Sequence, residues 1–149
     1  MNARPGKDPS RSLHAFGTGR RVTLNRRLAL PEVAVVDAEL HGAPGVAVRG
    51  EIDLAAVPSL EQALDGAIRD TAGAFVLDLC DVDFIDSSGS RSVLRARALL
   101  ARDDRALAII CPPGPVRRLF EFIGIADLLF LYTSREEAAA ALVPPDSAA

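Results

Sequence analysis

The chain has 149 residues, a formal net charge of −3 and 49% hydrophobic residues, few of them aromatic, so it suits a single domain with an aliphatic core. Its two cysteines, Cys80 and Cys111, have no second Cys or His at ligand spacing, which favours reduced core thiols and argues against a metal site. No apolar run approaches the roughly 18 residues that span a bilayer, so we expect a cytoplasmic protein without stable membrane insertion.

Basic residues are concentrated at the amino-terminal end. Residues 1–31 carry seven of the 17 basic residues and one acidic residue, a net +6, whereas the remainder carries −9. This acidic body argues against nucleic acid as a direct partner. The Gly, Pro, Ser and Arg of the first residues are typical of a disordered leader; a start codon placed too far upstream and a weak electrostatic tether are the alternatives. We assign residues 1–30 to a basic, disordered leader, 31–143 to one domain and 144–149 to a flexible tail.

From Pro31 onward, strand and helix patterns alternate. Apolar alternation and turn residues predict five strands, at residues 32–40, 46–52, 75–81, 106–111 and 128–132. The first two are joined by the turn-rich segment 41–45, which suits a hairpin. Apolar spacing and end signals predict four helices, at residues 58–69, from the turn after residue 86 to about 102, at 116–123, and from the capping box at 134–137.

A hairpin followed by β-α repeats predicts an α/β domain with a mixed, mostly parallel sheet of about five strands and four helices. If each strand lies beside the one before it, right-handed crossovers place all the helices on one face of the sheet. A doubly wound strand order is the alternative. On the third helix we expect Leu119, Phe120 and Ile123 in the core and Arg117 and Arg118 on a solvent face.

A turn of small polar and acidic residues, Asp86-Ser87-Ser88-Gly89, separates an apolar strand from the second helix. Ser or Asp at this position offers a side-chain oxygen to the free amides of the first helical turn, which is ordinary capping chemistry. The same amides and the helix dipole would also hold a phosphate. The turn is therefore either a simple cap or a site suited to modification of a serine.

Sequence patterns for catalysis are missing. The only histidines, His14 and His41, lie in the leader and in a turn, so a Ser-His-acid triad has no placed base. Gly89-Ser90-Arg91-Ser92-Val93 lacks the second glycine of a nucleophile elbow, and no Gly-rich loop is followed by Lys-Ser or Lys-Thr. We therefore predict neither enzymatic activity nor a cofactor.

Four carboxylates near the turn, Asp78, Asp81, Asp83 and Asp86, are dense enough to suggest a phospho-acceptor aspartate or a Mg²⁺ site. A receiver-type site also needs acids after the first strand and a lysine after the last one, and Lys7 is the only lysine. We interpret the four as solvated turn acids.

Three segments stand out in chain order: 48–53 (Val-Arg-Gly-Glu-Ile-Asp), 84–89 (Phe-Ile-Asp-Ser-Ser-Gly) and 116–121 (Val-Arg-Arg-Leu-Phe-Glu). Together they closely resemble STAS-domain anti-sigma factor antagonists, and the resemblance extends from Glu32 to Leu142. It implies a single STAS domain that binds an anti-sigma factor, itself a serine kinase, and so releases a sigma factor. Phosphorylation of the antagonist ends the binding, a phosphatase restores it, and we expect a monomer or a weak homodimer.

The resemblance implies a role for each motif residue. Ser88 is the phosphorylated serine, Asp86, Ser87 and Gly89 belong to the docking surface around it, and Asp53 lies in the neighbouring loop that contacts the kinase. From the residues alone, Asp86 and Asp53 are equally well explained as caps, and Gly89 as a residue that gives the backbone room.

The two residues after Gly89 depart from the family, which usually has an apolar residue and a glycine where this chain has Ser90 and Arg91. Arg91, Arg95 and Arg102 share one helical face, and Arg91 is three residues beyond Ser88. Either this face is solvated, or Arg91 pairs with phosphorylated Ser88 or with an acid on the partner, and is then part of the partner-binding site.

Other functions are possible for this sequence, two of them within the same fold. STAS domains also serve as scaffold or sensor subunits of stress-signalling assemblies and as soluble components of membrane transport systems. A small nucleotide-binding protein is a remote alternative, since no phosphate-cradling loop is visible.

Overall fold

The computed structural model describes residues 20–24 and 33–142. Within them a single sheet contains six strands: β1 (Arg20–Leu24), β2 (Ala34–Leu40), β3 (Ala43–Ile52), β4 (Phe75–Ile85), β5 (Leu107–Ile110) and β6 (Phe130–Tyr132). The helices are α1 (Val57–Arg69), α2 (Ser87–Ala101), α3 (Pro115–Phe122) and α4 (Arg135–Leu142), with short 3-10 turns η2 (Leu54–Ala56) and η3 (Ala126–Leu128). None of these helices is long and apolar enough to cross a membrane.

The strands lie in the sheet in chain order, β1-β2-β3-β4-β5-β6. The first two pairings are antiparallel and the next three are parallel. This confirms the α/β class, the hairpin and the mixed, mostly parallel sheet, and it excludes the doubly wound order. The sequence analysis did not predict β1, which lies within the segment 1–30; the rest of that segment and the predicted tail 144–149 lie outside the described residues.

The hairpin turn is shorter than the predicted segment 41–45. Leu40 pairs with Ala43, so only His41 and Gly42 connect β2 to β3, and both have positive φ angles, 50° and 85°. Two central residues with positive φ define a type I′ turn, whose twist matches that of the two strands.

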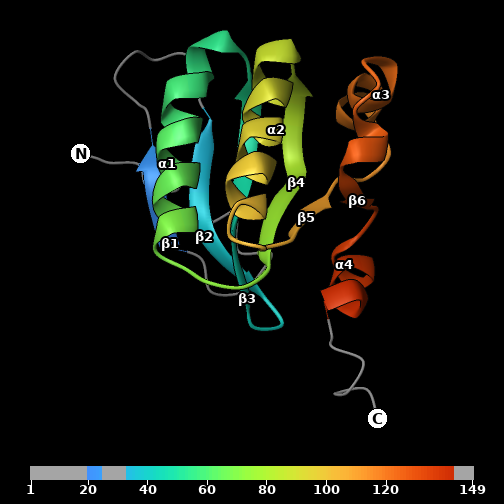
Figure 1. Cartoon of the computed structure of the whole chain (residues 1–149). Helices are drawn as coiled ribbons and strands as arrows, with labels where there is room; N and C mark the ends of the chain where they lie inside the picture. Colours follow the sequence, from blue (N-terminus) through green and yellow to red (C-terminus); the bar gives the residue numbers. More distant parts are fainter. Residues whose placement is uncertain (1–19, 25–32, 143–149) are drawn as a thin grey trace, which may run out of the picture.

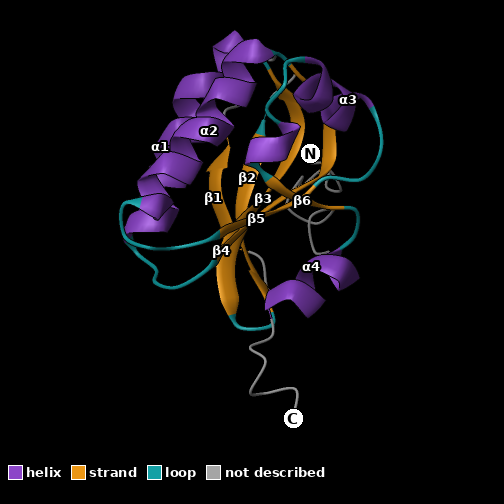
Figure 2. Cartoon of the chain, turned by 45° about the vertical axis from the view of Figure 1, so that its right-hand side comes forward, coloured by secondary structure: helices purple, strands orange, loops and turns teal. Residues whose placement is uncertain are grey.

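Helices cover both faces of the sheet. α1, α2 and α3 pack on one face and share its main apolar core, which includes Phe75, Leu77 and Phe120; α1 and α2 lie side by side in front of the strands (Figure 1). α4 packs on the other face, where Ala138 contacts Val76 and Ile110 (Figure 2). The expectation that all helices lie on one face is therefore wrong for α4, because it follows the last strand and forms no crossover.

Both cysteines are free, Cys80 half-buried and Cys111 buried in the main core. Burial raises the pKa of Cys80 to about 12, with added effects of the neighbouring Asp78. Burial also raises the pKa of Cys111 to about 11. Both thiols are therefore protonated at neutral pH. The predicted core position is confirmed for Cys111, whereas Cys80 is half-buried.

Candidate partner-binding site

The predicted site residues meet at the carboxyl ends of two neighbouring parallel strands. Ile52 at the end of β3 pairs with Ile85 at the end of β4, so the loops that begin at Asp53 and Asp86 lie side by side. The backbone N–H of Asp86 donates to the carbonyl of Ile52 over 3.1 Å, which ties the start of α2 to the end of β3. Because parallel strands end at the same edge of a sheet, residues 33 positions apart form one surface.

Asp86 is the hub of the hydrogen bonds in this turn. Its Oδ1 accepts from the Ser88 hydroxyl over 2.6 Å and from the Gly89 N–H over 3.0 Å, and the backbone amides of Ser88 and Leu54 add to these. Burial acts to raise the pKa of Asp86, but these donors outweigh it and hold the pKa below its ordinary value. Asp86 is thus the N-cap of α2, as the capping interpretation predicted.

Asp86 also fills a role that the sequence analysis gave to a phosphate. We expected the first-turn amides of α2 to hold a phosphate on Ser88, but the Asp86 carboxylate already accepts from the amides of Ser88 and Gly89. A group added to Ser88 Oγ therefore has to point away from the helix start or displace this carboxylate, and a phosphate held by the amides stays a prediction.

Asp86→Ala is expected to lower the free energy of unfolding at neutral pH by about 1–2 kcal/mol, because it removes the cap. The folded-state pKa of Asp86 is lowered, so its contribution is present above the unfolded pKa of about 4 and is lost as the pH falls through the folded value. Urea unfolding at several pH values should show the gap between wild type and variant closing below about pH 4. Asp81→Ala, which removes an exposed carboxylate from β4, is the control; a gap for Asp86→Ala that does not change with pH contradicts the assignment.

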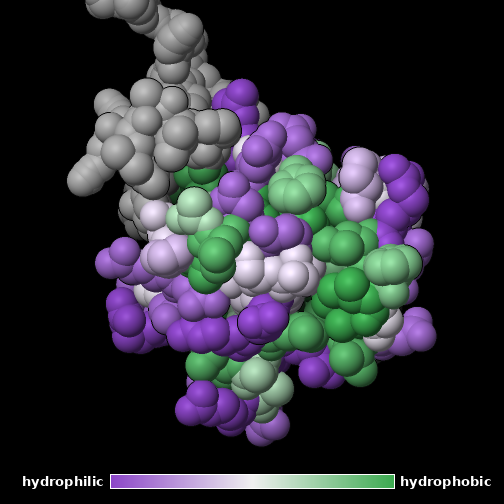
Figure 3. All heavy atoms as spheres, turned by 90° about the horizontal axis from the view of Figure 1, so that it is seen from above, coloured by the Kyte–Doolittle hydropathy of each residue, from purple (hydrophilic) through white to green (hydrophobic). Residues whose placement is uncertain are grey.

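The residues of the turn differ in exposure. Ser87 is exposed, Ser88 is half-buried and Gly89 is buried. Seen along the strands from their carboxyl ends, the face that bears this turn carries polar residues beside a wide apolar area (Figure 3). The Ser87 side chain is therefore open to solvent and that of Ser88 partly so, whereas Gly89 lies beneath them.

Gly89 allows a close approach between α2 and the strand ends. A Cβ at this position would lie 2.6 Å from Ile52 Cγ2, 2.7 Å from Ile85 Cγ1 and 2.9 Å from the carbonyl oxygen of Ile52. Only glycine fits there without a shift of β3, so the interpretation of Gly89 as a residue that gives the backbone room is confirmed.

Asp53 caps the 3-10 turn after β3. Its Oδ1 accepts from the N–H of Ala56 over 3.1 Å, and its side chain is half-buried. The capping interpretation of Asp53 is confirmed, and contact with a partner stays a prediction.

The three arginines that share a face of α2 have separate environments. Arg95 makes two hydrogen bonds to Asp65 of α1, of 2.8 and 2.9 Å, so it faces α1 and not the solvent alone. Arg102 and Arg91 are exposed, Arg91 near the serine turn.

Ser90, the other departure from the family, is buried, and its hydroxyl donates to the carbonyl of Asp86 over 3.1 Å. The polar side chain after Gly89 is therefore satisfied within the helix start and does not face the solvent.

Comparison with known proteins identifies the family. The model of the STAS domain matches residues 36–138. An anti-sigma-B factor antagonist of Staphylococcus aureus is 31% identical over 91 residues, which cover 61% of this chain and 84% of that protein. The chain belongs to the STAS-domain anti-sigma factor antagonist family.

Solved structures agree with this assignment. A crystal structure of an anti-sigma factor antagonist from Mycobacterium paratuberculosis is 26% identical and has a TM-score of 0.69, covering 74% of this chain and 94% of that chain. The antagonist SpoIIAA in its unphosphorylated form, at 20% identity, shares the fold with a TM-score of 0.56, covering 85% of this chain and all of that one.

The acidic cluster of this STAS domain is not uniform. Asp78 is buried, 2% exposed, and its Oδ2 accepts from Arg135 Nε of α4 over 2.9 Å. The interpretation as solvated turn acids is therefore wrong for Asp78, which points to the face that α4 covers. Asp81 and Asp83 are exposed, and Asp86 is the cap.

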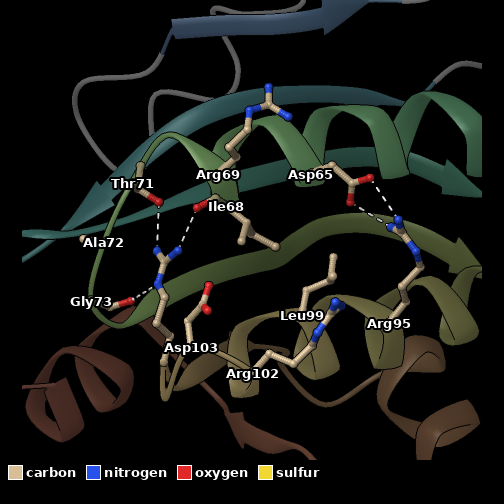
Figure 4. A pocket seen from close by; sticks show the side chains of 11 residues that line it. Asp65, Ile68, Arg69, Thr71, Ala72, Gly73, Arg95, Leu99, Arg102 and Asp103 are labelled. Atoms are coloured by element: carbon tan, nitrogen blue, oxygen red, sulfur yellow. Dashed lines mark hydrogen bonds and ion pairs between the residues drawn. The ribbon is translucent and has the colours of Figure 1, made fainter.

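A separate cavity of about 650 Å³ lies at the far end of α1 and α2 from the serine turn (Figure 4). Arg105 lines it and donates to the carbonyls of Ile68 and Gly73, over 2.7 Å each, and to the hydroxyl of Thr71 over 2.9 Å. These bonds occupy carbonyls at the end of α1 and in the following loop, which is a structural role. None of the predicted site residues lines this cavity.

Proposed function

We propose that this protein binds an anti-sigma factor with serine kinase activity, that it thereby releases a sigma factor, and that phosphorylation of Ser88 switches it off. The observation that carries the proposal is the position of Ser88 on the strand-end surface, with its hydroxyl hydrogen-bonded over 2.6 Å to the cap Asp86. Asp53, Asp86, Ser87 and Arg91 surround it in the same surface and complete the partner-binding site, with Gly89 as its support.

The chemistry of the switch follows from the bonds around Asp86. Transfer of the γ-phosphoryl group of ATP to Ser88 Oγ forms phosphoserine and ADP and releases the hydroxyl proton. The modified serine can no longer donate to Asp86, and it gains nearly two negative charges beside a carboxylate whose pKa is already lowered. Because that carboxylate already accepts from the Gly89 amide at the start of α2, we propose that the phosphate points away from the helix start and toward the partner.

The same bonds explain how phosphorylation of one serine could end partner binding without a larger change of structure. The cap, the tie to Ile52 and the packing of Gly89 hold the turn independently of the phosphate. We propose that phosphorylation therefore removes complementarity without refolding the domain, and that a phosphatase restores binding. Arg91, exposed and three residues beyond Ser88, is proposed to pair with the phosphate or with an acid on the partner.

The test uses the purified protein, the histidine-kinase-like anti-sigma factor of the same genome, and ATP. We expect one phosphate, on Ser88, by mass spectrometry, and release of the complex as it forms. Ser88→Ala should stay bound and unmodified, and Ser88→Asp should bind weakly. Ser87→Ala is the matched control because it removes the neighbouring exposed hydroxyl and should leave phosphorylation intact.

Three results would count against the proposal: phosphate on another residue, a Ser88→Ala protein that is still modified, or binding that phosphorylation leaves unchanged. Copurification with a transport subunit in place of an anti-sigma factor would favour the other STAS functions. The Arg91→Ala variant is tested in the same assay. If it binds and is phosphorylated as fast as wild type, Arg91 does not pair with the phosphate or with an acid on the partner.

A further inference from the structure

We infer that the anti-sigma factor docks on an apolar surface that lies on both sides of Ser88. This docking surface consists of Leu54 on one side and, on the other, a groove between the end of β4 and α3 lined by Phe84, Ile85, Pro115, Arg118, Leu119 and Phe122. The inference rests on the proposed function and adds the residues that bind the partner and the chemistry of the partner's own surface.

Three large apolar side chains of the docking surface are exposed to solvent. Phe122 at the end of α3 is 86% exposed, Leu54 is 71% exposed and Phe84 is 47% exposed. The groove between the end of β4 and α3, which Phe84 and Phe122 line, has a volume of about 340 Å³. Apolar residues gather beside α3 on the face that also bears the serine turn (Figure 3). Large exposed apolar areas on a folded domain mark surfaces that bind other molecules.

This surface is continuous with the phosphorylation site. Ile85 lines the groove and directly precedes the cap Asp86. Leu54 begins η2, which leads into α1, and α2 with Ser88 at its start stands between α1 and α3 (Figure 1). Ser88, bonded to the Asp86 carboxylate, therefore has apolar side chains on either side of it. A kinase that binds at Ser88 would therefore also cover the exposed apolar side chains beside it.

The charges beside the apolar side chains specify the partner further. Asp53 precedes Leu54 and Glu121 precedes Phe122 in the sequence, whereas Arg118 lines the groove itself. An interface with an apolar centre and a polar rim is the common arrangement between proteins. The complementary surface of the anti-sigma factor accordingly has an apolar centre and a polar rim, with an acidic group opposite Arg118.

The docking surface also gives a reason for the effect of phosphorylation. An unmodified Ser88 enters the interface with its hydroxyl already paired to Asp86, so its burial costs little. A phosphoserine in the same place is a dianion among apolar contacts, and its desolvation opposes docking even where the rim of the partner is polar.

The experiment measures binding of the full chain to the purified anti-sigma factor by calorimetry. Phe122→Ala and Phe84→Ala are each expected to weaken binding about tenfold, as truncation of a buried aromatic contact does. Leu54→Ala is a further variant on the opposite side of Ser88. Because all three side chains are exposed, we expect the thermal unfolding midpoint of each variant to stay near that of wild type.

Phe130→Ala is the matched control. Phe130 in β6 is 65% exposed, and the strand alternation directs it to the face opposite α3, since the next residue, Leu131, packs against the helix-side core. It should bind within about twofold of wild type.

The docking surface is overturned if wild type binds the anti-sigma factor and Phe122→Ala, Phe84→Ala and Leu54→Ala all bind equally well. A loss as large for Phe130→Ala has the same meaning, because it indicates a different face. Both results leave phosphorylation at Ser88 standing. A wild-type protein that neither binds nor is phosphorylated refutes the proposed function itself.

Discussion

Gly89→Ala is expected to lower the free energy of unfolding by about 3 kcal/mol and to reduce binding of the anti-sigma factor. The added Cβ meets two isoleucine side chains and, 2.9 Å away, the carbonyl oxygen of Ile52. Overpacking of this kind costs about 1–3 kcal/mol, and the upper end applies where a backbone atom has to move. Here the carbonyl that must move also accepts the N–H of Asp86, so the variant loosens the tie between the two loops of the site.

Guanidinium chloride unfolding measures this prediction, and Gly66→Ala is its control. Gly66 lies inside α1, where a Cβ meets only Arg69 Nη2 at 3.6 Å, an ordinary contact. An alanine in a helix interior stabilises by up to about 1 kcal/mol relative to glycine. Opposite signs for the two substitutions are therefore expected. A Gly89→Ala protein as stable as wild type would contradict the close approach that shapes the turn.

The contrast between these glycines indicates how the fold produces the site. The parallel pairing of Ile52 with Ile85 places the two loops together, and Gly89 lets α2 start against both residues. The cap Asp86 then orients the Ser88 hydroxyl. Ser88 is thus presented by a closely packed turn, which suits a residue that a partner must recognise in a fixed position.

Local patterns predicted what depends on neighbours in the chain. The alternating elements, the cap Asp86 and the turn around Ser88 follow from period, capping chemistry and motif, because each involves residues within a few positions. The strand β1 was missed because its five residues, two of them arginines, lie in a segment whose composition is typical of disorder.

Contacts between distant residues were not predictable in this way. Arg95 binds Asp65 across 30 positions, and the helical wheel that groups Arg95 with Arg91 contains no information about α1. The exposure of Ile123, 37%, also differs from the predicted core position, because α3 ends there. The core prediction holds for Phe120, which is fully buried, and in part for Leu119, which packs against the core and also lines the groove. The sequence contains one indication that Phe122 is exposed: it follows the acidic Glu121 at the end of an amphipathic helix.

Asp78, on the other face of the sheet, is a second case in which local patterns do not predict a contact between distant residues. In sequence it is one of several closely spaced acids, yet only its side chain points under α4, where Arg135 pairs with it from 57 positions away. A strand directs alternate residues to opposite faces, but the sequence does not say which face a final helix covers. The pair thus fixes α4 to the sheet in a way that no local pattern indicated.

Arg135→Ala is accordingly expected to lower the free energy of unfolding by about 3 kcal/mol, since removing one partner leaves the buried Asp78 carboxylate without its guanidinium. Arg97→Ala, on the exposed side of α2, is the matched control and should change stability by less than about 0.5 kcal/mol. The double variant Asp78→Val with Arg135→Met should be more stable than Arg135→Ala alone, because apolar residues can replace a buried pair at little cost. Urea unfolding of the four proteins separates these cases. If Arg135→Ala and Arg97→Ala lose equally little, the ion pair does not hold α4, and the packing of Ala138 on Val76 and Ile110 is what keeps the helix in place.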